Sequence, residues 1–129
     1  MTYNSQSDYK PSYFFSSFFF TALGTQDSYN YNRVKRWSRR IRTCTNIFQL
    51  KNLVFPININ NTHWTLADIN FINMEIEYMD SMGDQGTTYT DTLLKFIEDE
   101  HMDKLRETLP NKEEWRTISR GTTSLNEIF

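Results

Sequence analysis

Three runs in the middle of the chain have the composition and alternation of apolar and polar residues that is typical of strands. They are "LVFPINI" (residues 53–59), "HWTLADINF" (63–71) and "MEIEYMD" (74–80). The polar "NNT" at 60–62 predicts a hairpin turn after the first run, and a second turn is expected near Ile72 and Asn73. Pro56 cannot donate a hydrogen bond to a neighbouring strand, which predicts an edge position or a bulge. The pattern therefore predicts a three-strand antiparallel meander.

Apolar residues recur at helical spacing on either side of this meander. In "YNYNRVKRWSRRI" they are Tyr31, Val34, Trp37 and Ile41, which predicts a helix with its basic residues on the other side. After Thr88 a second helix is predicted, which Pro110 limits. Its buried face is predicted to hold Leu93, Leu94, Ile97, Met102 and Leu105, and its water-facing side Glu98, Asp99, Glu100 and Lys104. His101 is expected to be a surface residue.

Length and composition limit the kind of protein. A chain of 129 residues with 38% hydrophobic residues can bury one core, so one domain is expected. The most apolar run, "YFFSSFFFTALG" at 13–24, is too short to cross a membrane and predicts a buried helix or strand. The net charge of −2 argues against a globally basic nucleic-acid binder. A single cysteine favours a reducing compartment, and we expect the nucleus or the cytoplasm.

The predicted meander brings a histidine and an aspartate together. With a turn at Ile72 and Asn73, Thr65 faces Asp80, and His63 lies one diagonal away on the same face, at roughly 7–8 Å between backbones. A carboxylate at that position can accept a hydrogen bond from one imidazole nitrogen. The other nitrogen is then left to act as a base towards a nucleophile.

Four motifs in a fixed order give this pattern a family resemblance. "VKRW", "VFPINI-NNTHWTLADI" and "IEYMDSMG", followed by a helix ending in "FIEDE", resemble the central part of the ubiquitin-like-specific proteases, the sentrin/SUMO-specific cysteine peptidases. The resemblance implies an α+β, papain-like cysteine protease fold, present in part, with the meander flanked by helices. It also implies a partial catalytic domain at 13–115 and an atypical tail at 116–129. Residues 1–12 are polar and rich in Ser, Tyr and Asn, and we expect them to be a disordered N-terminal segment.

The resemblance assigns roles to individual residues. His63 matches the general base of the family, and Asp80 matches the residue that orients it. Trp64 matches an aromatic residue lining the tunnel that holds the Gly-Gly tail of the modifier, although a core tryptophan is the alternative from the residues alone. Ser81, Met82 and Gly83 are expected to shape the turn after Asp80.

The nucleophile that the family requires is absent from this sequence. The family places it after the aspartate, in a Gly-Asp-Cys-Gly context, with a glutamine upstream that helps to bind the oxyanion. The one cysteine here, Cys44, precedes His63 within "RTCTN" and is interpreted as structural. A triad without its nucleophile forms no acyl-enzyme, so these 129 residues are expected to be inactive. Asp68 also departs from the family pattern, because an apolar residue is expected there and an unpaired buried carboxylate would shift towards its neutral form.

The implied activity is hydrolysis of the peptide or isopeptide bond after the Gly-Gly of SUMO or another ubiquitin-like modifier. A non-catalytic modifier-binding relic is the alternative, and a basic-helix nucleic-acid binder is a weaker one. The last rests on six cations within ten residues, namely Arg33, Lys35, Arg36, Arg39, Arg40 and Arg42, which are also typical of a solvated helix face, a nuclear-import signal or a docking face. We expect a monomer that binds the modifier and its conjugates, with no metal, no cofactor and no membrane association.

Overall fold

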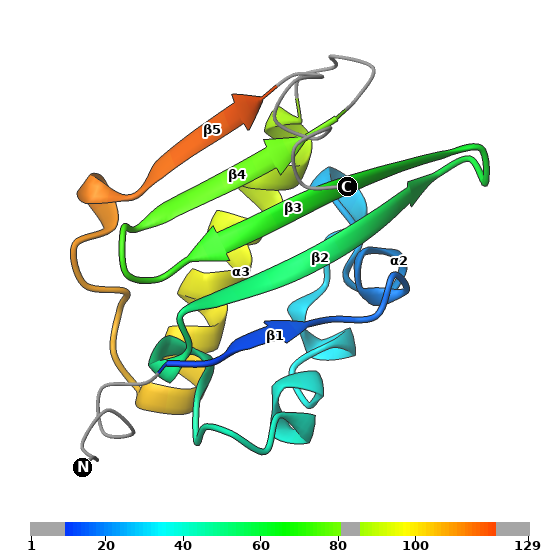
Figure 1. Cartoon of the computed structure of the whole chain (residues 1–129). Helices are drawn as coiled ribbons and strands as arrows, with labels where there is room; N and C mark the ends of the chain where they lie inside the picture. Colours follow the sequence, from blue (N-terminus) through cyan, green and yellow to red (C-terminus); the bar gives the residue numbers. More distant parts are fainter. Residues whose placement is uncertain (1–9, 81–85, 121–129) are drawn as a thin grey trace, which may run out of the picture.

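A five-stranded mixed sheet organises the chain, with the long helix α3 across one face (Figure 1). The computed structural model describes residues 10–80 and 86–120. The strands, in spatial order, are β1 (Ser12–Phe14), β2 (Asn52–Ile59), β3 (His63–Asn70), β4 (Glu75–Met79) and β5 (Arg116–Arg120). The α-helices are α2 (Phe19–Leu23) and α3 (Thr87–Leu105). The 3₁₀ turns are η1 (Gln26–Ser28), η2 (Tyr31–Arg33), η3 (Trp37–Arg40), η4 (Ile47–Gln49) and η5 (Lys112–Glu114).

The predicted antiparallel meander is confirmed as β2, β3 and β4. Asn60 and Asn61 both have positive φ in the β2–β3 turn, which asparagine tolerates better than most residues. Pro56 is paired with Leu66 of β3 but lies beyond the segment of β2 that β1 covers. Its nitrogen therefore needs no partner on the outer side, and the predicted edge position is correct.

Both outer strands are parallel additions that the hydrophobic pattern did not reveal. β1 pairs with β2 and begins at Ser12, so the prediction of disorder up to residue 12 is wrong at this residue. Within the 13–24 run, Phe19–Leu23 forms α2. β5 comes from the segment interpreted as an atypical tail and pairs with β4. The sheet thus continues past residue 115. Residues 1–9 and 121–129, which fall in the predicted disordered start and atypical tail, lie outside the described residues.

The helix predicted over the basic segment is wrong. The chain forms the two short 3₁₀ turns η2 and η3, joined by a turn at Val34–Arg36. Tyr31, Val34 and Trp37 are three residues apart, and in a 3₁₀ helix side chains at that spacing align. Val34 is buried, and Trp37 packs edge-to-face on Phe19. The apolar side of the segment was correctly identified, but its period is three and not 3.6.

The α3 helix forms as predicted, although its buried face is partly different. Leu93 and Ile97 are buried, but Met102 and Leu105 are exposed. Glu100 was expected to face water, yet it is fully buried. It accepts a hydrogen bond from the hydroxyl of Tyr31 at 2.6 Å and pairs with Lys104 at 3.0 Å, and these contacts hold η2 against the helix.

His101 is a second correction on α3, because it is buried and not on the surface. Its Nδ1 donates to the carbonyl oxygen of Glu107 at 2.8 Å, and its ring packs edge-to-face on Phe48. The chain that follows α3 is therefore tied back to the helix. Among the described residues, no helix combines the length and the apolar character needed to cross a membrane.

Candidate active site

The register of β3 and β4 places His63 and Asp80 as the sequence predicted. Leu66 pairs with Met79, so the same ladder continued by one residue sets Thr65 opposite Asp80. His63 is the first residue of β3 and Asp80 follows the last residue of β4, at the same end of the sheet. In Figure 1 this is the end at which the β2–β3 hairpin projects.

The two side chains form a short hydrogen bond. Nε2 of His63 lies 2.5 Å from Oδ1 of Asp80. The carboxylate is fully buried, and the imidazole side chain keeps 23% of its surface exposed. A carboxylate can only accept, so Nε2 carries the proton and Nδ1 has a free lone pair. Within the described part of the chain Nδ1 has no hydrogen-bond partner, so this atom is available to a reacting group.

Tyr78 is a contributor that the sequence analysis missed. Its hydroxyl donates to Oδ2 of Asp80 at 3.1 Å, so each carboxylate oxygen has a donor. Burial, with the negative charge of Asp80 as a smaller cause, raises the pKa of Tyr78 to about 12, and the phenol therefore remains a donor at neutral pH. The sequence could have predicted this contact, because Tyr78 is two residues before Asp80 and residues at that spacing on a strand share a face.

The start of α3 holds the Tyr78 ring in place. Tyr78 stacks on Tyr89 with ring centroids 5.3 Å apart. Gly86 lies against the same ring, and a Cβ at this position would overlap it. The residue before α3 is thus close-packed against the residue that contacts Asp80.

Trp64 points away from this pair, because neighbouring residues on a strand face opposite sides of the sheet. Its side chain is 53% exposed, so the alternative of a core tryptophan is wrong. The indole is therefore accessible from outside the protein. Ser81, Met82 and Gly83 lie outside the described residues.

Cys44 is remote from the site along the sheet. It lies between η3 and η4, and η4 leads into the start of β2, whereas His63 is next to the hairpin at the far end of that strand. The thiol is half-buried against the core, and burial raises its pKa. A thiol held in its protonated form is a poor nucleophile, in agreement with the structural interpretation of Cys44.

Asp68 is half-buried but not unpaired, which corrects the expectation from the sequence. Asn52 donates to its Oδ1 at 2.7 Å. Burial raises the pKa of Asp68 to about 6, and the charge of Glu77, its cross-strand neighbour, adds to that shift, whereas the hydrogen bond from Asn52 opposes it. The predicted shift towards the neutral form is therefore present.

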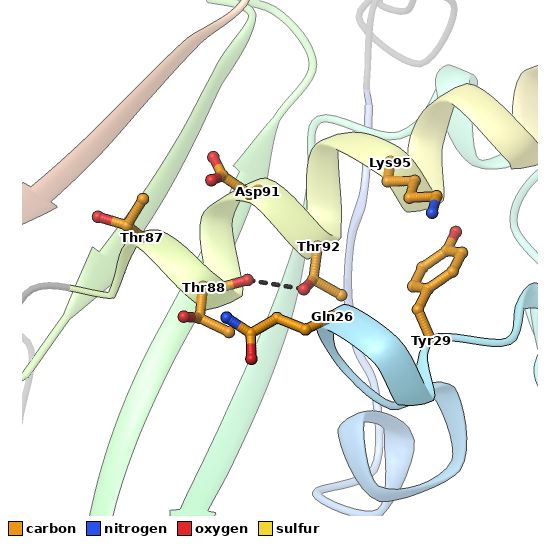
Figure 2. Close-up of a pocket in the computed structure, with 7 residues that line it drawn as sticks. All are labelled: Gln26, Tyr29, Thr87, Thr88, Asp91, Thr92 and Lys95. Carbon is orange, nitrogen blue, oxygen red and sulfur yellow. Dashed lines mark hydrogen bonds between the residues drawn. The ribbon is translucent and has the colours of Figure 1, made fainter.

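A separate cleft of about 290 Å³ lies between η1 and the first turns of α3 (Figure 2). Three of its polar side chains, those of Tyr29, Thr92 and Lys95, interact with other groups of the protein. Tyr29 donates to Asp99 at 2.6 Å, and Nζ of Lys95 sits 4.4 Å from the centre of the Tyr29 ring. Thr92 donates to the carbonyl of Thr88. We assign no function to this cleft, and the described residues contain no cluster with the ligands to hold a metal ion.

Comparison with known proteins places this geometry in a family. Residues 1–123 match the Ulp1 protease family, C-terminal catalytic domain. The chain belongs to the Ulp1 protease family. It is 36% identical over 93 residues to ubiquitin-like-specific protease 1A of Arabidopsis thaliana, which covers 71% of this chain. Sentrin-specific protease 2 of Homo sapiens is 32% identical over 112 residues, or 87% of this chain.

Solved structures of the family share the fold. The C-terminal Ulp1 protease domain in complex with Smt3, the yeast ortholog of SUMO, aligns with a TM-score of 0.63 at 28% identity and covers 85% of this chain. A de-sumoylating protease aligns with a TM-score of 0.70 at 26% identity, also over 85% of this chain. This Ulp1-family chain therefore has the papain-like cysteine protease fold predicted from its motifs.

The family match covers only part of each relative. This Ulp1-family chain spans 18% of the two curated relatives. It spans 47% and 43% of the two solved chains. A solved SUMO protease Ulp1 is described with its catalytic cysteine oxidised to a sulfonic acid. A catalytic cysteine therefore exists in that relative, whereas the only cysteine of the present sequence is Cys44.

Proposed function

We propose that this chain is the histidine–aspartate part of a SUMO-type cysteine protease. The observation that carries the proposal is the 2.5 Å hydrogen bond between Nε2 of His63 and the buried Oδ1 of Asp80. The reaction would be hydrolysis of the peptide or isopeptide bond that follows the Gly-Gly of a ubiquitin-like modifier. The Smt3 complex of the Ulp1 domain supports this class of partner.

In the proposed mechanism His63 acts as the base through Nδ1. A cysteine thiol placed beside Nδ1 transfers its proton there, and the thiolate attacks the carbonyl carbon of the second glycine. The imidazolium gives the proton to the leaving amine, so a thioester remains on the enzyme. Water, deprotonated by the same nitrogen, then releases the modifier and restores the thiol. Asp80 keeps Nε2 protonated throughout and stabilises the imidazolium.

The cysteine for this step is not among the 129 residues in a usable position. We infer that these residues alone do not hydrolyse the bond. In longer family members, the nucleophile and the oxyanion donor are expected to come after the residue that matches Asp80. Trp64 is proposed to line the tunnel for the glycine tail, because glycines pass between aromatic walls that exclude larger side chains. We also propose that residues 13–115 form the partial catalytic domain. The nucleus or the cytoplasm is the proposed location.

A non-catalytic role is the second candidate. The half-exposed indole of Trp64 supports it, since a relic that retains the tunnel wall could bind the modifier without cutting it. Binding without cleavage would favour this candidate if no longer form of the protein carries a nucleophile.

A modifier with a C-terminal electrophile that traps active cysteine peptidases tests the proposal. The 129-residue protein is expected to form no adduct. A fusion in which residues 1–120 continue into the cysteine-bearing half of a Ulp1 protease domain is expected to form one. In that fusion His63→Ala should abolish the adduct and Asp80→Asn should slow its formation by orders of magnitude.

Two results would overturn the assignment. One is an adduct on Cys44 of the 129-residue protein, for which Cys44→Ser is the control. The other is a fusion that reacts equally fast with and without the His63 imidazole.

A further inference from the structure

Four arginines repeat every three residues along the segment that contains η2 and η3. Residues 33, 36, 39 and 42 are arginine, and all four are exposed. Arg33 ends η2, Arg36 precedes η3 and Arg39 lies within it, and 3₁₀ geometry, with three residues per turn and about 2 Å of rise per residue, places such side chains on one side about 6 Å apart. Arg42 follows Ile41, whose backbone is extended, and continues the same spacing in the sequence beyond η3. We call Arg33, Arg36, Arg39 and Arg42 the arginine stripe.

The stripe is held on a rigid base. On the opposite side of the segment Val34 and Ile41 are buried, and Trp37 packs on the core. The hydroxyl of Tyr31 is fixed by the buried Glu100 of α3. Little conformational entropy of the backbone would therefore be lost when a partner binds.

Within residues 10–80 and 86–120, the charges of the stripe have no acidic partner. Among the described residues no carboxylate forms an ion pair with any of the four, and Arg33 contacts only the carbonyl of Ser28, at 3.4 Å. Of the other two cations of the segment, Arg40 stacks on Trp37, and Lys35 lines the same cleft as Asp103 of α3.

The remainder of the chain is acidic. Residues 33–42 carry six positive charges and no acid, and the whole chain carries −2, so the other residues carry −8. Asp103 of α3 lies beside this segment and accepts a hydrogen bond from Tyr31. A long polyanion such as a nucleic acid would extend past the stripe and meet these carboxylates, whereas a short acidic segment would not.

We propose that the arginine stripe is a docking surface for an acidic polypeptide segment in extended conformation. On one face of a strand, side chains repeat every two residues at about 6.6 Å, close to the spacing of the stripe. A segment with Glu or Asp at alternate positions places each carboxylate at one guanidinium, whose planar fork binds carboxylates in a bidentate manner. This surface is independent of the proposed protease site, so either can fail alone.

Fluorescence anisotropy with the labelled peptide Thr-Glu-Thr-Glu-Thr-Glu-Thr-Glu tests the surface on the 129-residue protein. The test variant is Arg36→Glu, Arg39→Glu and Arg42→Glu together. The matched control is Lys10→Glu, Lys51→Glu and Arg106→Glu, which changes the net charge equally at exposed positions outside the stripe. Far-UV circular dichroism checks that both variants are folded.

The test variant is expected to bind the peptide at least about tenfold more weakly, and the control within about twofold of the unmodified protein. Binding of the unmodified protein should weaken between about 50 mM and 300 mM salt, since the charges are exposed. A peptide with its four glutamates consecutive should bind more weakly than the alternating one.

Three results would overturn the proposal. Equal loss in both triple variants would show that net charge and not the stripe controls binding. Equal affinity for the consecutive and alternating peptides would show that the spacing of the carboxylates does not control binding. Tighter, stripe-dependent binding of single-stranded DNA of the same charge would assign the surface to nucleic acid.

Discussion

Substitution of Gly86 by alanine tests how the start of α3 supports the catalytic pair. A Cβ at this position would overlap the ring of Tyr78, with even Cδ1 only 2.6 Å away. The backbone at Gly86 has φ −103, which alanine adopts without strain, so the clash is the main effect. Overpacking of a buried ring costs about 1–3 kcal/mol, and alanine is also a poorer N-cap than glycine. We expect Gly86→Ala to lower the free energy of unfolding by about 2–3 kcal/mol.

The same methyl group should weaken the hydrogen bond to Asp80. Tyr78 donates to this carboxylate at 3.1 Å, and a ring pushed away from Gly86 cannot keep both that contact and its stacking on Tyr89. The carboxylate that orients His63 then loses a donor. The substitution at Gly86 is therefore expected to alter the position of the His63 imidazole through the buried side chain of Tyr78.

Urea unfolding measures the first effect, and the downfield imidazole N–H proton of His63 in NMR spectra measures the second. Gly24→Ala is the matched control, because it also destabilises through φ 78 and a clash with Ser28 but does not touch Tyr78. The His63 signal should shift or broaden in Gly86→Ala and remain unchanged in Gly24→Ala. If Gly86→Ala unfolds within about 0.5 kcal/mol of the unmodified protein with the signal in place, the packing argument is wrong.

Three further predictions concern ionisable groups outside the site. The pKa of Asp68 is raised to about 6 in the folded protein, above its ordinary 3.8, so between these two pH values the folded state holds more protons and its stability falls as pH rises. Asp68→Asn should therefore gain up to about 3 kcal/mol relative to the unmodified protein between pH 4 and pH 7 in urea unfolding, and an equal pH slope in both proteins would contradict this. Lys104→Met removes the cation paired with the buried Glu100 and should cost about 2–3 kcal/mol by thermal unfolding. Lys112→Met breaks an exposed ion pair and should cost under about 0.5 kcal/mol, so equal losses would refute the role of burial. Cys44 should react with iodoacetamide at pH 7 more slowly than a free cysteine peptide, because burial raises its pKa, and faster alkylation would show an activated thiol.

The sequence by itself determined the meander and the pairing of His63 with Asp80. Side chains on a strand alternate with a period of two, and a tight turn fixes the antiparallel register, so both features follow from a short stretch of chain. Two of the four family motifs, "VFPINI-NNTHWTLADI" and "IEYMDSMG", lie in the same stretch, which is why the fold was predicted together with the site. The 3.6-residue pattern also located α3 correctly.

The tertiary structure alone decided the features that depend on distant neighbours. Ser12–Phe14 and Arg116–Arg120 become strands because β2 and β4 offer free edges, and nothing local to these residues specifies that pairing. The helical pattern alone predicts that Glu100 faces water. In the fold it is buried, because the hydroxyl of Tyr31, from a distant part of the chain, donates a hydrogen bond to its carboxylate. The burial of a polar group is decided by the partner it meets across the fold, and a local hydrophobic pattern does not contain that partner.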